Sequence, residues 1–188
     1  MKISVKTLTL SAMFLALALV LPFLTGQIPQ IGSSMLPMHL PVLLCGFLCG
    51  WPWGLAVGFI APLLRSLLFG MPPMPGVALP MAFELAAYGA LTGLLYGWLR
   101  SVPRVKTMSE KTWQAVIVIA ALIVAMLLGR LVWGAAKYAV VTLFAAGPFT
   151  LPMFFAGAFV TAWPGILVQL VLIPPIVLAL SRLTPAKQ

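Results

Sequence analysis

Long apolar runs separated by short polar or proline-rich links dominate this sequence. They predict six helices, near residues 6–24, 38–50, 53–70, 77–99, 113–142 and 163–182. A helix needs about 20 residues to cross the hydrocarbon core of a bilayer. The pattern therefore predicts an all-α integral membrane protein with six transmembrane helices, in which residues 1–188 form a single domain.

The first apolar run follows a basic start that contains Lys2 and Lys6, an arrangement that signal peptides also have. The run is longer than the apolar region of a signal peptide, and no A-x-A cleavage pattern is well placed after it. We therefore expect this run to be the first transmembrane helix, retained in the mature protein.

Two segments depart from a regular helical pattern. Residues 147–162 are apolar but contain Pro148 and Pro152, so they extend the last helix or form a loop over the outer face; a loop is favoured. The helix at 38–50 is short and has Pro41 near its start. Because irregular backbone at membrane depth is tolerated only inside protein or along a cavity, both segments predict irregular external loops that cover an outward-facing pocket.

Composition and charge support this class and set the orientation. Hydrophobic residues make up 63% of the chain and charged residues 7%, against roughly a quarter charged in soluble domains. With both termini cytoplasmic, eight of the eleven basic residues fall on the cytoplasmic side: Lys2, Lys6, Arg100, Arg104, Lys106, Lys111, Arg182 and Lys187. The net charge of +9 is thus an orientation signal and an attraction to anionic lipid, and it does not indicate nucleic-acid binding.

Five ionisable residues remain inside the predicted helices, and counting along each helix puts all of them in the outer half of the membrane. They are His39, Arg65, Glu84, Arg130 and Lys137. A charged group at mid-membrane costs roughly 2.5 to 3.5 kcal/mol even on the most lenient scale. Their collection in one leaflet predicts a polar pocket that opens outward.

Glu84 and Tyr88 are four residues apart and share one face of their helix, which we expect to point into the bundle. Glu84 contacts the ligand or forms a buried ion pair with Arg65 that holds two helices together. If it neutralises Arg65, then Arg130 and Lys137 leave a positive excess that suits a carboxylate or phosphate. Lys137 has a simpler alternative, in which it only reaches out to the headgroups.

Methionines gather in or beside the external segments, and their flexible thioethers suit an adaptable pocket wall, although generic packing is the alternative. Six of the ten lie there: Met35, Met38, Met71, Met74, Met81 and Met153. Met38 is the one of these that we count among the candidate substrate-binding residues. His39 is the only histidine, and Cys45 and Cys49 are best interpreted as packing residues. We therefore expect neither a metal site nor a cofactor.

The motifs of catalysis are missing from the sequence. It has no Walker-type loop, no H-E-x-x-H and no aspartate, so neither a Ser-His-Asp set nor a carboxylate pair is plausible. An enzyme is therefore not expected. Uphill transport would need energy from a partner or from an ion gradient.

The chain resembles the substrate-binding S components of energy-coupling factor (ECF) vitamin transporters. The resemblance rests on the six-helix plan, the alanines of the first helix and three stretches: "LPMHLPVLLCGFLCGWPWGLAVGFIAPLLRSLLFGMPP", "MAFELAAYGALTGLLYG" and "PGILVQLVLIPP". It implies high-affinity binding of a vitamin-type solute from outside, at a site built by the external loops and the outer helix ends. It also implies a prokaryotic plasma membrane as the location.

The resemblance further implies the partners. These are a transmembrane scaffold subunit and two cytoplasmic ATPases, whose ATP hydrolysis drives toppling of the S component. An A-x-x-x-A motif on the first helix docks against the scaffold in that family, and Ala12 and Ala16 match it here.

The substrate and two other functions stay open. The positive excess favours an anionic vitamin such as pantothenate, while a neutral ring compound similar to pyridoxine, a corrinoid or a folate are alternatives. A stand-alone secondary permease for a small organic anion, or a small membrane enzyme or assembly factor, would be a different class of function.

Overall fold

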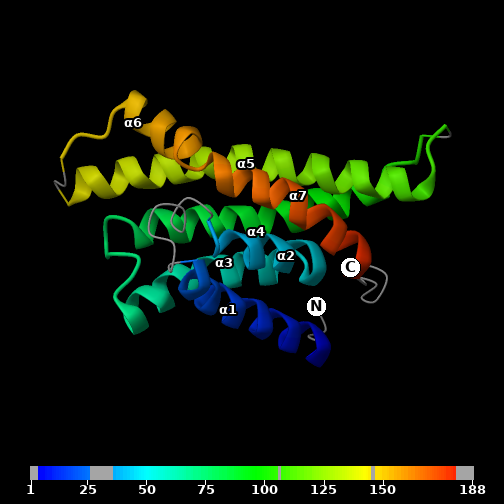
Figure 1. The fold of residues 1–188 in the computed structure, drawn as a ribbon, viewed down its shortest axis with the longest axis horizontal. Coiled ribbons are helices and arrows are strands. Elements are labelled where there is room, and N and C mark those ends of the chain that lie inside the picture. Colours follow the sequence, from blue (N-terminus) through cyan, green and yellow to red (C-terminus); the bar gives the residue numbers. More distant parts are fainter. Residues whose placement is uncertain (1–3, 26–35, 106, 145–146, 181–188) are drawn as a thin grey trace.

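The computed structural model describes residues 4–25, 36–105, 107–144 and 147–180, and these residues fold as helices with short connections (Figure 1). The elements are α1 (Val5–Thr25), α2 (His39–Cys49), α3 (Trp51–Phe69), α4 (Ala78–Ser101), α5 (Glu110–Leu143), α6 (Leu151–Phe155), the π-helical turn η1 (Ala156–Val160) and α7 (Trp163–Leu180).

Five of these helices, α1, α3, α4, α5 and α7, are long and apolar enough to cross a membrane. The prediction of six spanning helices is not confirmed, because α2 has only 11 residues. At about 1.5 Å per residue it covers roughly 16 Å, half of a bilayer core. The helix starts at His39 because the chain before it turns through Leu36, whose φ is 50°.

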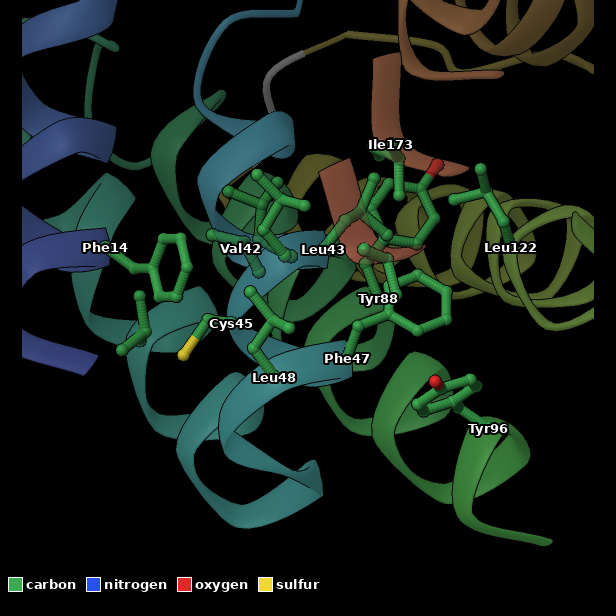
Figure 2. Close-up of a cluster of buried hydrophobic side chains, with 14 of the residues drawn as sticks. Phe14, Val42, Leu43, Cys45, Phe47, Leu48, Tyr88, Tyr96, Leu122 and Ile173 are labelled. Atoms are coloured by element: carbon green, nitrogen blue, oxygen red, sulfur yellow. The ribbon is translucent and has the colours of Figure 1, made fainter. Parts of the chain in front are cut away.

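The apolar core surrounds α2, whose side chains are buried on nearly every face (Figure 2). Figure 2 shows Val42, Leu43, Cys45, Phe47 and Leu48 of α2 among Phe14, Tyr88, Leu122 and Ile173 of the neighbouring helices. A helix that is apolar all round belongs inside a bundle. The half-length α2 is therefore the central helix, and its first residue, His39, begins at depth rather than at the surface.

Glycines let α3 and α4 approach until their backbones touch. Gly54 and Gly58 of α3 are one turn apart, as are Gly89 and Gly93 of α4. A methyl group on Gly54 or Gly89 would overlap the backbone of the other, and one on Gly58 would overlap the backbone of Leu85. One glycine of each small-xxx-small pair, Gly54 and Gly89, thus faces the other, and such pairs let membrane helices approach closely.

Residues 147–162 do not form the loop that was favoured from the sequence. They contain α6 and η1, and only Thr161 and Ala162 separate η1 from α7, so the alternative of an extension to the last helix is closer to the structure. Pro152 lies in the first turn of α6, where its missing N–H costs no hydrogen bond. Because both prolines precede the second turn, they do not prevent helix formation here.

The connections divide between two ends of the bundle (Figure 1). The starts of α1 and α5 and the ends of α4 and α7 lie at one end, and the α3–α4 connection and α6 lie at the other. The described basic residues Lys6, Arg100, Arg104 and Lys111 belong to the first of these ends, which we call the basic end. The other four basic residues assigned to the cytoplasm, Lys2, Lys106, Arg182 and Lys187, lie outside the described residues.

Candidate functional site

Five polar side chains from four helices are buried in the half of the bundle away from the basic end. They are His39 of α2, Glu84 and Tyr88 of α4, Arg130 of α5 and Gln169 of α7, and each is 5% exposed or less. We call these residues the polar cluster. Gln169 lies one turn before Ile173, which packs in the same core as Tyr88, and α7 contacts both α2 and α5. The cluster therefore takes its residues from four helices, and contacts among its members connect α2, α4 and α5.

Glu84 is the acidic centre of the polar cluster. Its Oε1 lies 2.8 Å from Arg130 Nη1 and 3.6 Å from His39 Nε2. The ring of His39 also contacts that of Tyr88, with centroids 5.5 Å apart. Gly129 makes the approach of α5 possible, because a methyl group there would overlap the Tyr88 ring. The sequence pair Gly129-Arg130 thus places an ion-pairing side chain directly beside a contact that only glycine permits.

Many polar atoms of the cluster have no hydrogen-bond partner among the described residues. By strict distance and angle these atoms are both ring nitrogens of His39, Oη of Tyr88, Nε and Nη2 of Arg130, and both amide atoms of Gln169. The His39 ring and the Tyr88 hydroxyl nevertheless interact with the nearby Glu84 carboxylate, so the amide of Gln169 is the group with the fewest partners. Most buried polar groups in proteins are hydrogen-bonded, and leaving one unpaired costs roughly 1 to 3 kcal/mol. These buried donors and acceptors are therefore available to a polar solute.

The hypothesis of an ion pair between Glu84 and Arg65 is wrong. Arg65 Nη1 donates instead to the carbonyl oxygen of Leu19 on α1, at 2.6 Å. Its guanidinium also lies over the rings of Phe23 and Phe69, 4.5 and 5.5 Å from their centroids. The physical reason is the order of the helices: Arg65 faces α1, whereas Glu84 faces α2 and α5. Arg65 therefore fastens α1 to α3 and is not part of the polar cluster.

Lys137 does not join the polar cluster either. It is half-buried, and its Nζ donates to the carbonyl oxygen of Gly76 at 2.6 Å, in the connection that precedes α4. The lysine thus fastens the end of α5 to the α3–α4 connection. Since Glu84 neutralises Arg130, the positive excess deduced from the sequence is absent from the cluster as the structure describes it.

The methionines contribute less to the interior than their positions suggested. Met38 is buried beside His39, but Met71, Met74 and Met153 are exposed, Met81 is half-buried, and Met35 lies outside the described residues. Met38 is therefore the one fully buried methionine among the described members of this set, and Met81 packs against the core from α4.

An apolar groove of about 350 Å³ lies between α5 and the segment before and within α6. Its lining includes Leu131, Gly134 and Tyr138 of α5 and Phe149 and Phe154 of the covering segment. Gly134 is one turn beyond Arg130 on α5, so the groove lies one turn further from the basic end than the polar cluster. The groove's lining does not include any of the five cluster residues.

Ala12 and Ala16 lie on the exposed face of α1, while Ser11, Phe14 and Ala18 are buried against the bundle. The spacing in the sequence predicted that the two alanines share one face of the helix. The structure adds that this face points away from the bundle. Their methyl groups leave a flat strip that another helix could approach closely.

Comparison with known families decides the class. The family described as "ECF transporter, substrate-specific component" matches residues 6–177, which is most of the chain. The chain belongs to this family. No curated protein and no solved structure matches it. The protein is thus a multi-pass membrane protein and a transporter subunit rather than an enzyme, and the resemblance deduced from the sequence is confirmed.

Sequence reasoning missed Gln169 as a site residue. A signal was present, because glutamine is the only amide or ionisable residue between Trp163 and Leu180, a segment that is otherwise apolar. The same cost argument that singled out the five ionisable groups applies to a buried amide. It was overlooked because only charged groups and their partners were counted.

Proposed function

We propose that this S component binds a small vitamin-type solute at the polar cluster, from the side opposite the basic end, and releases it across the membrane with an ECF module. The observation that supports this is the set of unpaired buried donors and acceptors on His39, Tyr88, Arg130 and Gln169. A solute that pairs with them recovers the hydrogen bonds that the core lacks. The family supplies the transport role, and the basic end, by the positive-inside rule, is cytoplasmic.

The charge balance of the cluster favours a neutral or zwitterionic solute. Arg130 and Glu84 cancel each other, and Arg65 and Lys137 are engaged elsewhere. A buried anion would need an unmatched cation, which this arrangement does not offer. We therefore replace the earlier preference for an anionic vitamin with a compact ring compound that carries both donors and acceptors, and the apolar groove beside α6 is its path of entry.

Replacing Gln169 with leucine is expected to weaken solute binding at least tenfold, about 1.4 kcal/mol, because the ligand loses an amide partner. The free energy of unfolding should stay the same or rise, because leucine removes a buried amide that has no hydrogen-bond partner among the described residues. Mass spectrometry of the solute released from the purified protein identifies the probe, and calorimetry measures its affinity for each variant.

Gln114→Leu is the matched control, since it makes the same change in a half-buried residue at the basic end. Its affinity should equal that of the unaltered protein. If Gln169→Leu and Gln114→Leu bind the solute with equal affinity, Gln169 is not part of the site. If the released solute carries a net negative charge, the proposed class of solute is wrong.

We propose that the partners are a transmembrane scaffold subunit and two cytoplasmic ATPases in the plasma membrane of a prokaryote, and that the scaffold packs on the alanine strip of α1. Tryptophan at Ala12 or Ala16 is expected to lower co-purification of the scaffold at least about tenfold, by separating two closely packed helices. Solute binding should remain, because both alanines are exposed and on the far side of α1 from the core.

Leu17→Trp is the control for this experiment, because Leu17 is also exposed on α1 but is rotated about 100° from Ala16. It should retain the scaffold. Scaffold retention by all three variants would contradict the docking face, and uptake by the isolated protein driven by an ion gradient would favour a stand-alone permease instead.

A further inference from the structure

A second, polar groove lies at the basic end of the bundle, far from the polar cluster. Its volume is about 440 Å³, and its lining comes from the end of α4, the following connection and the first turns of α5. The residues that line it are Arg100, Val102, Arg104, Glu110, Trp113, Gln114 and Ile117.

Two guanidinium groups in this groove lack a carboxylate partner among the residues that the structure describes. The described ion pairs both involve Glu84 in the core. Glu110, the only acid in the groove, lies instead beside the amide of Gln114, with 3.4 Å between Oε1 and Nε2. Arg100 and Arg104 thus keep their charge and their donors for another group.

Arg100 is also held in position. Its guanidinium lies 5.4 Å from the ring centroid of Tyr96, which is itself buried. This cation–π contact favours a position of the guanidinium near the groove, and the exposed side chain keeps donors for an oxyanion. Arginine forks match the geometry of a phosphate with two parallel hydrogen bonds.

The surroundings of the groove are those of a membrane interface. Its lining includes the half-buried Trp113 and the buried Ile117. Further along the same face of α5 the exposed side chains are apolar, among them Val124 and Leu128. A ligand with a phosphate at one end and hydrocarbon at the other would meet the charge in the groove and the apolar surface beyond it.

We propose that this groove binds the headgroup of an anionic phospholipid from the cytoplasmic leaflet, with the phosphate between Arg100 and Arg104 and the acyl chains along the apolar face of α5. The site is independent of the solute site. It would anchor the α4–α5 end of the bundle to the inner membrane surface, at the end opposite the polar cluster.

The test measures lipid binding to the full chain after delipidation, with phosphatidylglycerol and phosphatidylcholine as probes and native mass spectrometry as the readout. We expect a preference for phosphatidylglycerol that falls about thirtyfold in the double variant Arg100→Gln, Arg104→Gln, since each basic residue contributes about a factor of five near an anionic surface. Glu110→Gln should raise the preference, because it removes the one carboxylate that repels a phosphate from the groove.

The double variant Lys6→Gln, Lys111→Gln removes the same charge from the same end without altering the lining of the groove, and it should keep the preference. Equal losses in the two double variants would mean diffuse attraction and overturn the site. Two other results would also overturn it. One is binding of inorganic phosphate that depends on the two arginines while phosphatidylglycerol is not preferred. The other is binding of an acidic peptide that depends on the two arginines while phosphatidylglycerol is not preferred.

Discussion

Replacing Glu84 with glutamine is expected to lower the free energy of unfolding by about 3 to 5 kcal/mol, the usual result of removing one partner from a buried ion pair. Arg130 would remain buried and charged, and His39 would lose the carboxylate beside it. Reversible unfolding in mixed micelles measures the change. The effect is large because Glu84 is the only acid among the described residues of the core.

Glu110→Gln is the matched control, because Glu110 is the only other acidic residue of the chain and is exposed at the start of α5. Its unfolding free energy should change by no more than about 0.5 kcal/mol. A loss for Glu84→Gln as small as that of the control would show that the pair with Arg130 does not stabilise the fold.

A double variant separates the two roles of Glu84. Changing Glu84 to glutamine and Arg130 to methionine together leaves no uncompensated charge, so most of the lost stability should return. Solute binding should not return, because two of the polar partners are gone. Recovery of both properties would mean that Glu84 and Arg130 only hold the helices together.

Alanine at Gly89 is expected to destabilise the bundle by about 1 to 3 kcal/mol, as overpacking usually does. The added methyl group would overlap the backbone of Gly54, and a backbone cannot turn aside as a long side chain can. This penalty opposes the gain of about 1 kcal/mol that alanine normally brings to a helix in water. Reversible unfolding in mixed micelles shows whether the free energy of unfolding of the Gly89→Ala variant falls or rises.

Gly76→Ala is the control for Gly89→Ala, because its methyl group would meet no atom within 4 Å. It should leave the stability nearly unchanged. A Gly89→Ala protein that is more stable than the unaltered chain would contradict the close contact between α3 and α4.

Hydropathy alone was enough for the class, and the cost of burying charge was enough to select three residues of the candidate site. The apolar runs predicted α1, α3, α4, α5 and α7 to within a few residues, because a span must be long and apolar whatever it packs against. The cost argument selected His39, Glu84 and Arg130, which the structure brings together in the core. The family match covers residues 6–177, which include all five of these helices except the first residue of α1 and the last three of α7.

Hydropathy and charge could not predict which of these ionisable groups form an ion pair with one another. A pair with Arg65 was one of the two roles that the sequence offered for Glu84, because the two residues lie in the outer halves of consecutive helices. The structure turns Arg65 toward α1 and brings α5 to Glu84, where Gly129 admits the ring of Tyr88. The prediction of a loop at 147–162 failed for a related reason, since proline breaks a helix only where its position demands a hydrogen bond.

The sequence by itself therefore determined that this protein is a membrane-embedded S component with a few costly polar residues in one half of its bundle. Depth and orientation depend on each residue's own transfer free energy, and that is a local property. Only the tertiary structure decided which charge cancels which, and hence that the polar cluster is neutral rather than cationic. That outcome depends on which helices are neighbours and on how closely their glycines let them approach, and neither is a property of any single helix.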